Sequence, residues 1–569
     1  MGWIQVYDPL HSVWLSTAAA ALPLVILLAA LALLEWRAHR AAAAGLAAAL
    51  AVAIFVFHMP ARAAFAAAIY GAAYGLLPIG WIVVTAVFLY NLTVRAGEFD
   101  RLRLGVAALA ADRRLQALLI AFSFGAFIEG AAGFGTPVAI TAALLIGLGF
   151  PRLYAAGLAL IANTAPVAFG AIGTPILTLA AVTGLPVQSL SAMAGRQLPI
   201  MSLLIPAWLV VTMSGWRGLR GVWPAVLVSG GSFAIVQFFW SNFIGPELVD
   251  IAGGLISLSA LTFFCRVWRP AEVWEFPSVA VQPRVTPAVT ASVAAPRVSS
   301  RALVPWLLLS VFVLLWGLPT IKARLNGGTS ASAKSVVAPA IDVPALHTRV
   351  FRDYPVEREA ANPAQIEDAA YRARRGEAAR FTFNWLSATG TAILFAAIAT
   401  AFALRLRASI VIDTARATLR QMLPSLATIA LMLALGFVTR YGGTDATLGL
   451  AFTRTGVFYP FFAPLLGWLG VAMTGSDTSS NVLFGSLQKI TAQQLNLSPI
   501  LICTANSTGG VMGKMIDAQS IVVATAATNQ LGEEGRILRF VFWHSIALAI
   551  LMGLLVLAQA YVTPWMIPA

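Results

Sequence analysis

Two carboxylic acids, Glu129 and Asp477, stand inside long apolar stretches of this chain, each within two residues of a glycine. An ionisable group in apolar surroundings is costly unless it is paired or hydrated, so such a group usually serves a function. Because burial favours the neutral form of a carboxylic acid, we expect Glu129 to bind and release a proton, with Asp477 as the second candidate. A buried hydrogen-bond anchor is the alternative for Glu129, and a helix N-cap is the alternative for Asp477.

Three further ionisable side chains, Lys514, Asp517 and His544, lie in the last apolar stretches. Lys514 and Asp517 are three residues apart, which places them on one face of a helix as candidate charge partners. His544 follows the basic residues Arg536 and Arg539, so we expect it near the membrane interface.

Glycine, proline and hydroxyl side chains interrupt the apolar stretches at four places. The interruptions lie around Gly133–Thr136, Ala165–Pro166, Ser476–Ser480 and Thr508–Gly510. Irregular backbone at membrane depth is tolerated where it lines a cavity, and a helix that begins there directs free N–H groups and a positive dipole end at that cavity. A small carboxylate with a neighbouring hydroxyl group suits these donors. Glycines and prolines that only kink helices, or let them pack closely, are the alternative.

The residues expected to contact such an anion all lie at or beside one of the four interruptions. They are Gly130, Gly133, Gly135, Thr136, Asn163, Thr164, Ser476, Thr478, Ser479, Ser480, Asn506, Ser507, Thr508 and Gly509. Glycine lets the backbone approach a ligand closely, and serine, threonine and asparagine add hydrogen-bond partners. The sequence therefore predicts one anion site to which both ends of the chain contribute.

The interruptions form two sets with the same layout. In order, we expect a re-entrant hairpin at 115–149, a broken helix at 153–183, a second hairpin at 456–494 and a second broken helix at 498–528. The hairpin glycine and the asparagine of the broken helix are 33 residues apart in the first set (Gly130 and Asn163) and 31 in the second (Gly475 and Asn506). On the charge map the first hairpin opens inside and the second outside, which is the pattern of an inverted repeat in a secondary transporter.

The composition indicates the elements that must position these residues. The chain has 569 residues, of which 59% are hydrophobic and 11% charged, and its mean hydropathy is +0.83. A soluble domain carries about 25% charged residues, and a helix needs roughly 20 apolar residues to span a membrane. The apolar runs, for example Val13–Leu34 and Val222–Phe243, are continuous rather than alternating, so we expect helices and not a barrel. We predict an all-α polytopic membrane protein with about twelve transmembrane helices plus the two hairpins.

The net charge of +14 comes from short basic clusters between apolar runs. This distribution sets the topology of a helical membrane protein and argues against nucleic-acid binding. It predicts that both termini are periplasmic, that residues 268–301 form a flexible cytoplasmic linker and that residues 321–380 form a periplasmic loop. The linker would separate an N-terminal membrane half, 1–267, from a C-terminal half, 302–569.

The sequence gives little support for a metal site or for an enzyme. The two cysteines and five histidines have no metal-ligand spacing, so we expect no metal and no cofactor. A membrane-embedded enzyme would need a nucleophile with its base, or a motif such as H-E-x-x-H, and the sequence contains neither. An ion channel is a further alternative, but inverted hairpins suit alternating access better.

Four long motifs resemble the L-lactate permease family. They are Gly125-Ala-Phe-Ile-Glu-Gly-Ala-Ala-Gly-Phe-Gly-Thr-Pro-Val-Ala-Ile140, Asn163-Thr-Ala-Pro-Val-Ala-Phe-Gly-Ala-Ile-Gly173, Thr474-Gly-Ser-Asp-Thr-Ser-Ser-Asn481 and Asn506-Ser-Thr-Gly-Gly-Val-Met-Gly-Lys-Met515. The resemblance covers the chain except for the two long polar segments. It implies proton symport of L-lactate, D-lactate and glycolate across the inner membrane, and kinship with the ion-transporter superfamily. Thr136, Thr174 and Asp517 depart from what the family leads us to expect.

Other transported anions remain open at this stage. A dicarboxylate would need a second cationic contact, and lysine and arginine are scarce inside the apolar runs. Coupling to Na⁺ instead of protons is the other alternative within transport.

Overall fold

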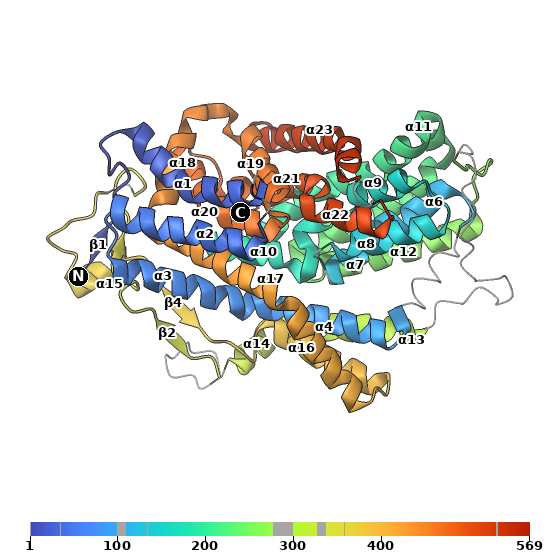
Figure 1. Ribbon diagram of the computed structural model, residues 1–569, viewed down its shortest axis with the longest axis horizontal. Coiled ribbons are helices and arrows are strands. Elements are labelled where there is room, and N and C mark those ends of the chain that lie inside the picture. The colour runs from blue at the N-terminus through green and yellow to red at the C-terminus, as the bar shows by residue number, and fades with distance from the viewer. Residues whose placement is uncertain are drawn as a thin grey trace.

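The computed structural model describes residues 2–32, 34, 36–99, 110–131, 133, 135–276, 300–326, 337–357, 359–530 and 533–568. Most of the predicted linker 268–301 and part of the predicted loop 321–380 lie outside these residues. Figure 1 shows an elongated bundle in which helices far apart in the sequence lie side by side. Helices make up most of the described residues, in agreement with the predicted fold class.

The helices of the first half follow the apolar runs of the sequence. They are α1 (Val13–Ala32), α2 (Ala38–Ala51), α3 (Ala61–Tyr74), α4 (Trp81–Arg95), α6 (Arg113–Ala117), α7 (Gly125–Ala131), α8 (Thr136–Gly147), α9 (Arg152–Ala162), α10 (Gly170–Thr183), α11 (Val187–Phe243) and α12 (Val249–Val267). A π-helical segment, Leu118–Phe124, joins α6 to α7, so that Arg113–Ala131 is one continuous, fully buried helix.

The second half contains the remaining helices and most of the strand residues. The helices are α13 (Ser300–Gly317), α14 (Pro319–Leu325), α15 (Ala369–Arg375), α16 (Thr389–Ala403), α17 (Ala408–Gly442), α18 (Thr444–Phe452), α19 (Tyr459–Thr474), α20 (Asp477–Gln494), α21 (Pro499–Gly513), α22 (Ala518–Ala527) and α23 (Glu534–Tyr561). The strands are β1 (Trp3–Ile4), β2 (Ala340–Asp342), β3 (Val350–Phe351) and β4 (Arg380–Thr382).

The number of spans differs from the expected value of about twelve. Within the described residues, eight helices are long and apolar enough to cross a membrane, or nine if the bent pair α9–α10 is one span. One source of the difference is α11, whose 57 residues would reach about 85 Å at 1.5 Å per residue, far more than the roughly 30 Å of a bilayer core. The expected count is therefore not confirmed, and the inverted repeat is likewise not confirmed.

The long helix α11 is in fact two antiparallel helices joined at Gly215. That glycine has φ 67° and ψ −176°, so the chain turns there. Hydrogen bonds join the two arms across the turn: Ser202 Oγ donates to Gln237 Oε1 at 2.8 Å, and Ser191 Oγ donates to the carbonyl oxygen of Ser241 at 2.9 Å. The two arms of α11 therefore count as two candidate spans rather than one.

The segment predicted as a periplasmic loop is folded onto the N-terminus. Strand β1 pairs in parallel with β3, and β2 pairs antiparallel with β4. These strands lie with α15 at the same end of the molecule as the N-terminus (Figure 1). Glu377 in this segment forms ion pairs with Arg352 at 2.8 Å and with Arg440 of α17 at 3.3 Å. Burial alone would raise the pKa of Glu377, but the two guanidinium groups hold it below its usual value.

Candidate functional site

The first hairpin turns at two glycines. The helix Arg113–Ala131 ends, and α8 begins at Thr136. Between them Gly133 and Gly135 have φ values of 58° and 78°, which glycine adopts without strain. A Cβ atom on Gly133 would lie 3.0 Å from the Cβ atom of Ala171, so the hairpin tip packs tightly against α10.

The first broken helix consists of α9 and α10, which meet at an angle of 60°. The chain passes from α9 through Asn163–Pro166 and a short 3₁₀ turn, Val167–Phe169, into α10. Just inside α10, Ala171 and Ile172 have φ values of 43° and 58°. Left-handed backbone at residues other than glycine costs of order 1–3 kcal/mol each and is retained mainly at functional sites.

Glu129 and Asn163 face this strained break. Glu129 is 4% exposed, and a Cβ atom on Gly170 would lie 2.5 Å from its Oε1 atom. Its Oε2 atom and both polar atoms of the Asn163 amide form no well-aligned hydrogen bond among the described residues, although the Asn163 amide lies close to the Glu129 carboxyl group. Because unpaired polar atoms are costly in a protein interior, two such side chains at one break mark it as a candidate site.

The second hairpin turns at Gly475 and Ser476. Helix α19 ends at Thr474, and the Oγ atom of Ser476 accepts a hydrogen bond from the backbone N–H of Ser479 at 3.2 Å. Ser476, and not Asp477, is therefore the N-cap of α20. Asp477 is 3% exposed and accepts a hydrogen bond from Ser507 Oγ, while its Oδ1 atom has no partner among the described residues.

The second broken helix is interrupted later in the chain than its sequence predicts. Helix α21 is continuous through Thr508–Gly510 and ends at Gly513; a 3₁₀ turn, Lys514–Ile516, follows. Asp517 then caps α22 by accepting a hydrogen bond from the backbone N–H of Ser520 at 2.8 Å. The break predicted at Thr508–Gly510 is wrong, because a glycine inside a helix costs only about 1 kcal/mol and the packing of α19 offsets that cost.

Gly509 illustrates this packing. A Cβ atom on Gly509 would lie 2.1 Å from the carbonyl oxygen of Pro464 in α19. One on Gly467 would lie 1.8 Å from the carbonyl oxygen of Asn506 in α21. Small residues let two helices approach this closely, so in this conformation Gly509 contacts a neighbouring helix rather than an open cavity.

The polar side chains of α20 and α21 bond mainly to one another. Asn506 Nδ2 donates to Asn481 Oδ1 at 3.0 Å, and Asn481 Nδ2 donates to Ser507 Oγ at 3.2 Å. Ser480 Oγ donates to the carbonyl oxygen of Gly467 at 3.1 Å. Of the predicted contact residues, Ser480, Asn506 and Ser507 thus already have protein partners.

Of four other predicted residues, Thr164, Thr136 and Thr478 flank breaks, whereas Thr508 lies within α21. Thr508 Oγ1 donates to Gln197 Oε1 at 2.6 Å, and Thr164 Oγ1 donates to the carbonyl oxygen of Ile161 at 2.7 Å. Thr136 and Thr478 are half-buried in the first turns of α8 and α20. The structure therefore brings some of the predicted residues to the hairpin tips and assigns others to helix packing.

Lys514 connects the second hairpin with the second broken helix. Its side chain is 5% exposed. The Nζ atom donates to the carbonyl oxygen of Gly475 at 2.7 Å and pairs with Asp517 Oδ2 at 3.2 Å. Glu129 and Asp477 both lie within its electrostatic range. The predicted pairing of Lys514 with Asp517 is present, and the same ammonium group also holds the tip of the second hairpin.

The two sets also touch through packing. Helix α22 packs against α8 and α9, and a Cβ atom on Gly135 would lie 3.7 Å from the side chain of Val523 in α22. Figure 1 shows α22 beside α8. The charged group around Lys514 therefore lies where the first hairpin meets the second broken helix.

His544 lies apart from this group. It is half-buried on α23, and its Nδ1 atom accepts a hydrogen bond from Trp208 Nε1 of α11 at 3.0 Å. This bond joins two helices, which is a structural role.

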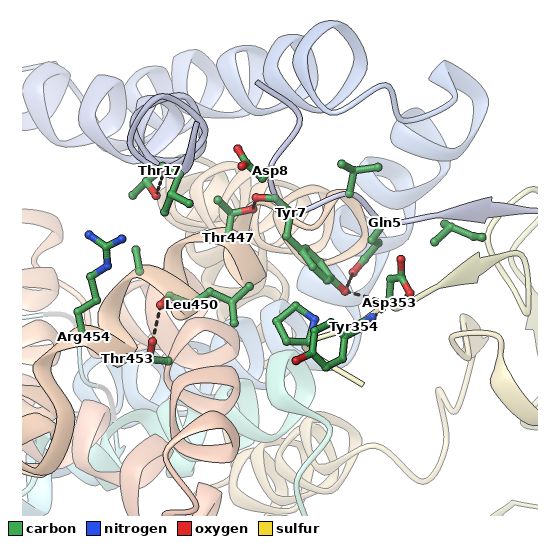
Figure 2. Close-up of a pocket in the computed structure, with 15 residues that line it drawn as sticks. Gln5, Tyr7, Asp8, Thr17, Asp353, Tyr354, Thr447, Leu450, Thr453 and Arg454 are labelled. Atoms are coloured by element: carbon green, nitrogen blue, oxygen red, sulfur yellow. Dashed lines mark hydrogen bonds between the residues drawn. The ribbon is translucent and has the colours of Figure 1, made fainter. Parts of the chain in front are cut away.

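An outer pocket of about 510 Å³ lies between the N-terminal segment, α1, α18 and residues 353–355. Figure 2 shows Gln5, Tyr7, Asp353 and Arg454 around it. Tyr7 is held there because the hydroxyl group of Thr447 donates to its carbonyl oxygen at 3.0 Å. The pocket contains none of the residues at the four predicted interruptions, so it is separate from the buried polar groups.

Comparison with known families decides what kind of protein this is. The model of the L-lactate permease family matches residues 16–563, nearly the whole chain. The chain belongs to the L-lactate permease family. The resemblance carried by the four motifs is thereby confirmed.

Individual relatives agree with this assignment over their full length. The L-lactate permease of Escherichia coli K12 is 47% identical over 567 residues, covering 100% of both chains. The glycolate permease GlcA of the same organism is 48% identical and covers 98% of both chains. The L-lactate permease of Bacillus subtilis is 44% identical and again covers 100% of both chains.

Membership of this family makes the chain a transport protein, not an enzyme. Its apolar helices place it in the bacterial inner membrane as a multi-pass protein. The buried charged group therefore belongs to a permease.

Several buried acidic residues of this permease were not predicted from the sequence, and Asp250 is the most deeply buried of them. Asp250 lies in the first turn of α12, is fully buried, and neither carboxyl oxygen has a hydrogen-bond partner among the described residues. A signal was present, since Asp250 is an acidic residue in an otherwise apolar stretch, like the acids that were singled out.

The packing role of Gly509 predicts a stability defect. We expect Gly509→Ala to lower the thermal stability of the detergent-purified protein, because overpacking a filled contact costs typically about 1–3 kcal/mol. Gly231→Ala is the matched control, since a Cβ atom on this α11 glycine meets nothing within 4 Å. Equal melting temperatures for the two variants would contradict the packing role.

Proposed function

We propose that the protein imports L-lactate and related 2-hydroxymonocarboxylates, glycolate and D-lactate among them, together with protons. Membership of the L-lactate permease family supports this proposal, as do relatives named L-lactate permease and glycolate permease.

The observation that carries proton coupling is the charge balance around Lys514. Three buried carboxyl groups, those of Glu129, Asp477 and Asp517, lie within range of this single ammonium group. A substrate carboxylate would add negative charge to a group already rich in acids, and like charges at close range disfavour one another in apolar surroundings. Uptake of a proton removes this repulsion, so binding of the proton and of the anion should favour each other.

The break between α9 and α10 is the position that best fits a bound substrate. The unpaired atoms of Glu129 and Asn163 face it, and the hydroxyl group of Thr136 lies close by in the chain. We propose that Asn163 hydrogen-bonds the 2-hydroxyl group of the substrate and that Lys514 attracts its carboxylate. The bonded side chains of α20 and α21 would hold Asp477 and the second hairpin tip in place.

Transport in proteoliposomes tests the function. With an alkaline interior, external acidification should drive accumulation of labelled L-lactate without Na⁺. Unlabelled glycolate should compete, and acetate should compete much less because it lacks the hydroxyl group. A requirement for Na⁺, or failure of glycolate to compete, would overturn the proposed coupling or the proposed substrate class.

We further propose that both termini are periplasmic, which cysteine labelling can test. In a background with Cys265 and Cys503 replaced by alanine, cysteines at positions 110 and 410 should react only from the cytoplasmic side. A cysteine at Ala345, in the folded segment near the N-terminus, should react from the periplasmic side. Reaction of positions 110 and 345 from one side would exclude this orientation.

A further inference from the structure

We propose that three basic side chains at the end of the molecule that holds the N-terminus, those of Arg352, Arg440 and Lys489, form a second anion site, which binds the carboxylate of a small organic acid. We call these three residues the cation cluster. In this conformation the carboxylate of Glu377 occupies the site. The site stands on its own contacts, whereas its role in admitting substrate rests on the proposed import of L-lactate.

Glu377 is the carboxylate that the cation cluster holds. Its Oε1 atom lies 2.8 Å from Nε of Arg352, and its Oε2 atom lies 3.3 Å from Nη2 of Arg440. These side chains are between 11% and 19% exposed, so that salt screens their ion pairs only in part. Guanidinium groups match planar carboxylates, and the end of a glutamate side chain is close in composition to acetate. The site therefore has the charge and the shape to hold a free monocarboxylate.

The end of α10 brings Lys489 to the same place. Arg440 Nη1 donates to the carbonyl oxygen of Val182 at 3.1 Å, and Lys489 Nζ donates to that of Thr183 at 2.7 Å. These carbonyl groups belong to adjacent residues in the last turn of α10, so the two cations are neighbours. Like charges at close range disfavour one another. A carboxylate in the cation cluster, whether from Glu377 or from a ligand, offsets this repulsion.

Asp445 is a further buried acid at this end of the molecule, and its hydrogen bonds go elsewhere. It accepts from Ser486 Oγ and from the backbone N–H of Ala446. Among the described ion pairs, Glu377 is the acid that pairs with the cation cluster. Arg440 Nε is buried and has no hydrogen-bond partner among the described residues. The cation cluster therefore has more donor groups than Glu377 satisfies.

The backbone around Glu377 is held in place independently of its side chain. The N–H of Glu377 donates to the carbonyl oxygen of Val350 at 2.8 Å, and its carbonyl oxygen accepts from the N–H of Thr348 at 2.9 Å. The hydroxyl group of Tyr441 donates to the carbonyl oxygen of Ala378 at 2.8 Å. A rotation of the Glu377 side chain is therefore enough to let a free carboxylate take its place.

The outer pocket adjoins the cation cluster. Gln5 lines this pocket (Figure 2), and its Nε2 atom donates to the carbonyl oxygen of Arg440 at 3.0 Å. Asp353 also lines the pocket and directly follows Arg352 in the chain. A small anion in the outer pocket would therefore lie next to the cation cluster.

Helices α10 and α20 connect the cation cluster with the buried polar groups of the proposed substrate position. They pack together, and Asn481 Nδ2 of α20 donates to the carbonyl oxygen of Pro175 in α10 at 3.2 Å. Helix α10 runs from the strained break to Thr183. Helix α20 runs from Asp477 past Lys489, which is about 18 Å further along the helix. With both termini periplasmic, the cation cluster is the first place where an entering substrate anion binds.

Chemical rescue tests the site without any transport. In Glu377→Ala the cations lose their partner and a space opens, so acetate should bind there and stabilise the folded protein. We expect sodium acetate to raise the melting temperature of the detergent-purified variant by about 2 °C more than sodium chloride of equal ionic strength does. Acetate is the probe because it lacks the 2-hydroxyl group and should be a poor ligand for the proposed substrate position.

The controls remove either an unrelated acid or the partner of the bound acetate. The parent and Asp413→Ala, which lacks an exposed acid of α17, should show no such shift. Glu377→Ala combined with Arg440→Met should show none either, because a guanidinium group that binds the acetate is missing. Glu377→Ser replaces Glu377→Ala if the latter does not fold. A shift no larger than with chloride, or an equal shift in the double variant, would overturn the site.

Uptake kinetics test the role in admitting substrate. Glu377→Gln removes the competing carboxylate, so the external L-lactate concentration for half-maximal uptake should fall by about threefold, whereas Lys489→Met should raise it by about threefold. Ion pairs that serve only stability would instead impair both variants alike, and changes in the same direction would overturn the entry role. Failure of the parent to transport L-lactate would overturn the proposed function, and rescue by acetate would still decide whether the site exists.

Discussion

Glu129→Gln is expected to lose accumulation of L-lactate driven by a pH gradient, by about tenfold or more, while still exchanging lactate across the membrane. Glutamine matches the size of protonated glutamic acid and cannot release a proton. The side chain is 4% exposed and faces Gly170 and the break between α9 and α10. A neutral residue there leaves the site able to take the anion but removes the link between anion and proton.

Two assays on one preparation separate these effects. Uptake against a concentration gradient requires coupling, whereas counterflow between equal pH values requires only binding and reorientation. Glu359→Gln, an exposed residue of the folded segment that contains β2, β3 and β4, is a suitable control because it lies far along the chain from the site. If Glu129→Gln concentrates lactate as well as the parent, the proton travels by another group, and Asp477→Asn is the next variant to measure.

Lys514→Met should have the second large effect, on both stability and transport. The ammonium group holds the carbonyl oxygen of Gly475 and the carboxylate of Asp517, and both side chains of the pair are at most 6% exposed. Removing one partner of a buried ion pair costs about 3–5 kcal/mol, because the other charge is left without compensation. We expect a clearly lower melting temperature and no measurable lactate uptake.

A double variant distinguishes the two roles of Lys514. Lys514→Met with Asp517→Asn removes both charges, so most of the lost stability should return. Transport should not return, because the proposed attraction for the substrate carboxylate is still missing. Lys322→Met, at an exposed position of α14, should match the parent in both measurements. Uptake at the parental rate in the stable double variant would show that Lys514 has only a structural role.

The two halves of the protein differ in how well their polar groups are paired. At the first break, Asn163 forms no well-aligned hydrogen bond within the described residues, and Ala171 and Ile172 are held in left-handed backbone. In the second half, Asn506 and Asn481 bond to each other. We therefore expect substitutions at the first break to change substrate affinity, and substitutions in the Asn481–Asn506 pair to change stability.

Local sequence was enough to predict the class of protein and the first hairpin turn. Charged residues are scarce and the apolar runs are long and continuous, so these runs must lie in a membrane. There they form helices, because a helix satisfies its own backbone hydrogen bonds. At Gly133 and Gly135 the local backbone requires positive φ, so the glycines mark the turn wherever the rest of the chain lies. The long motifs likewise indicated the family, which the match over residues 16–563 confirms.

Tertiary packing decided the roles of residues, such as Gly509 and Asp250, whose local sequence allows more than one role. Gly509 resembles a break residue in sequence, yet α19 packs against it and α21 continues to Gly513, because the role of a helical glycine depends on what fills the space above it. Asp250 shows the same dependence: 120 residues separate it from Gly130 in the chain, and only the close contact of α7 with α12 brings the two residues together. Packing and electrostatic interactions both depend on distance in space, which one sequence does not contain.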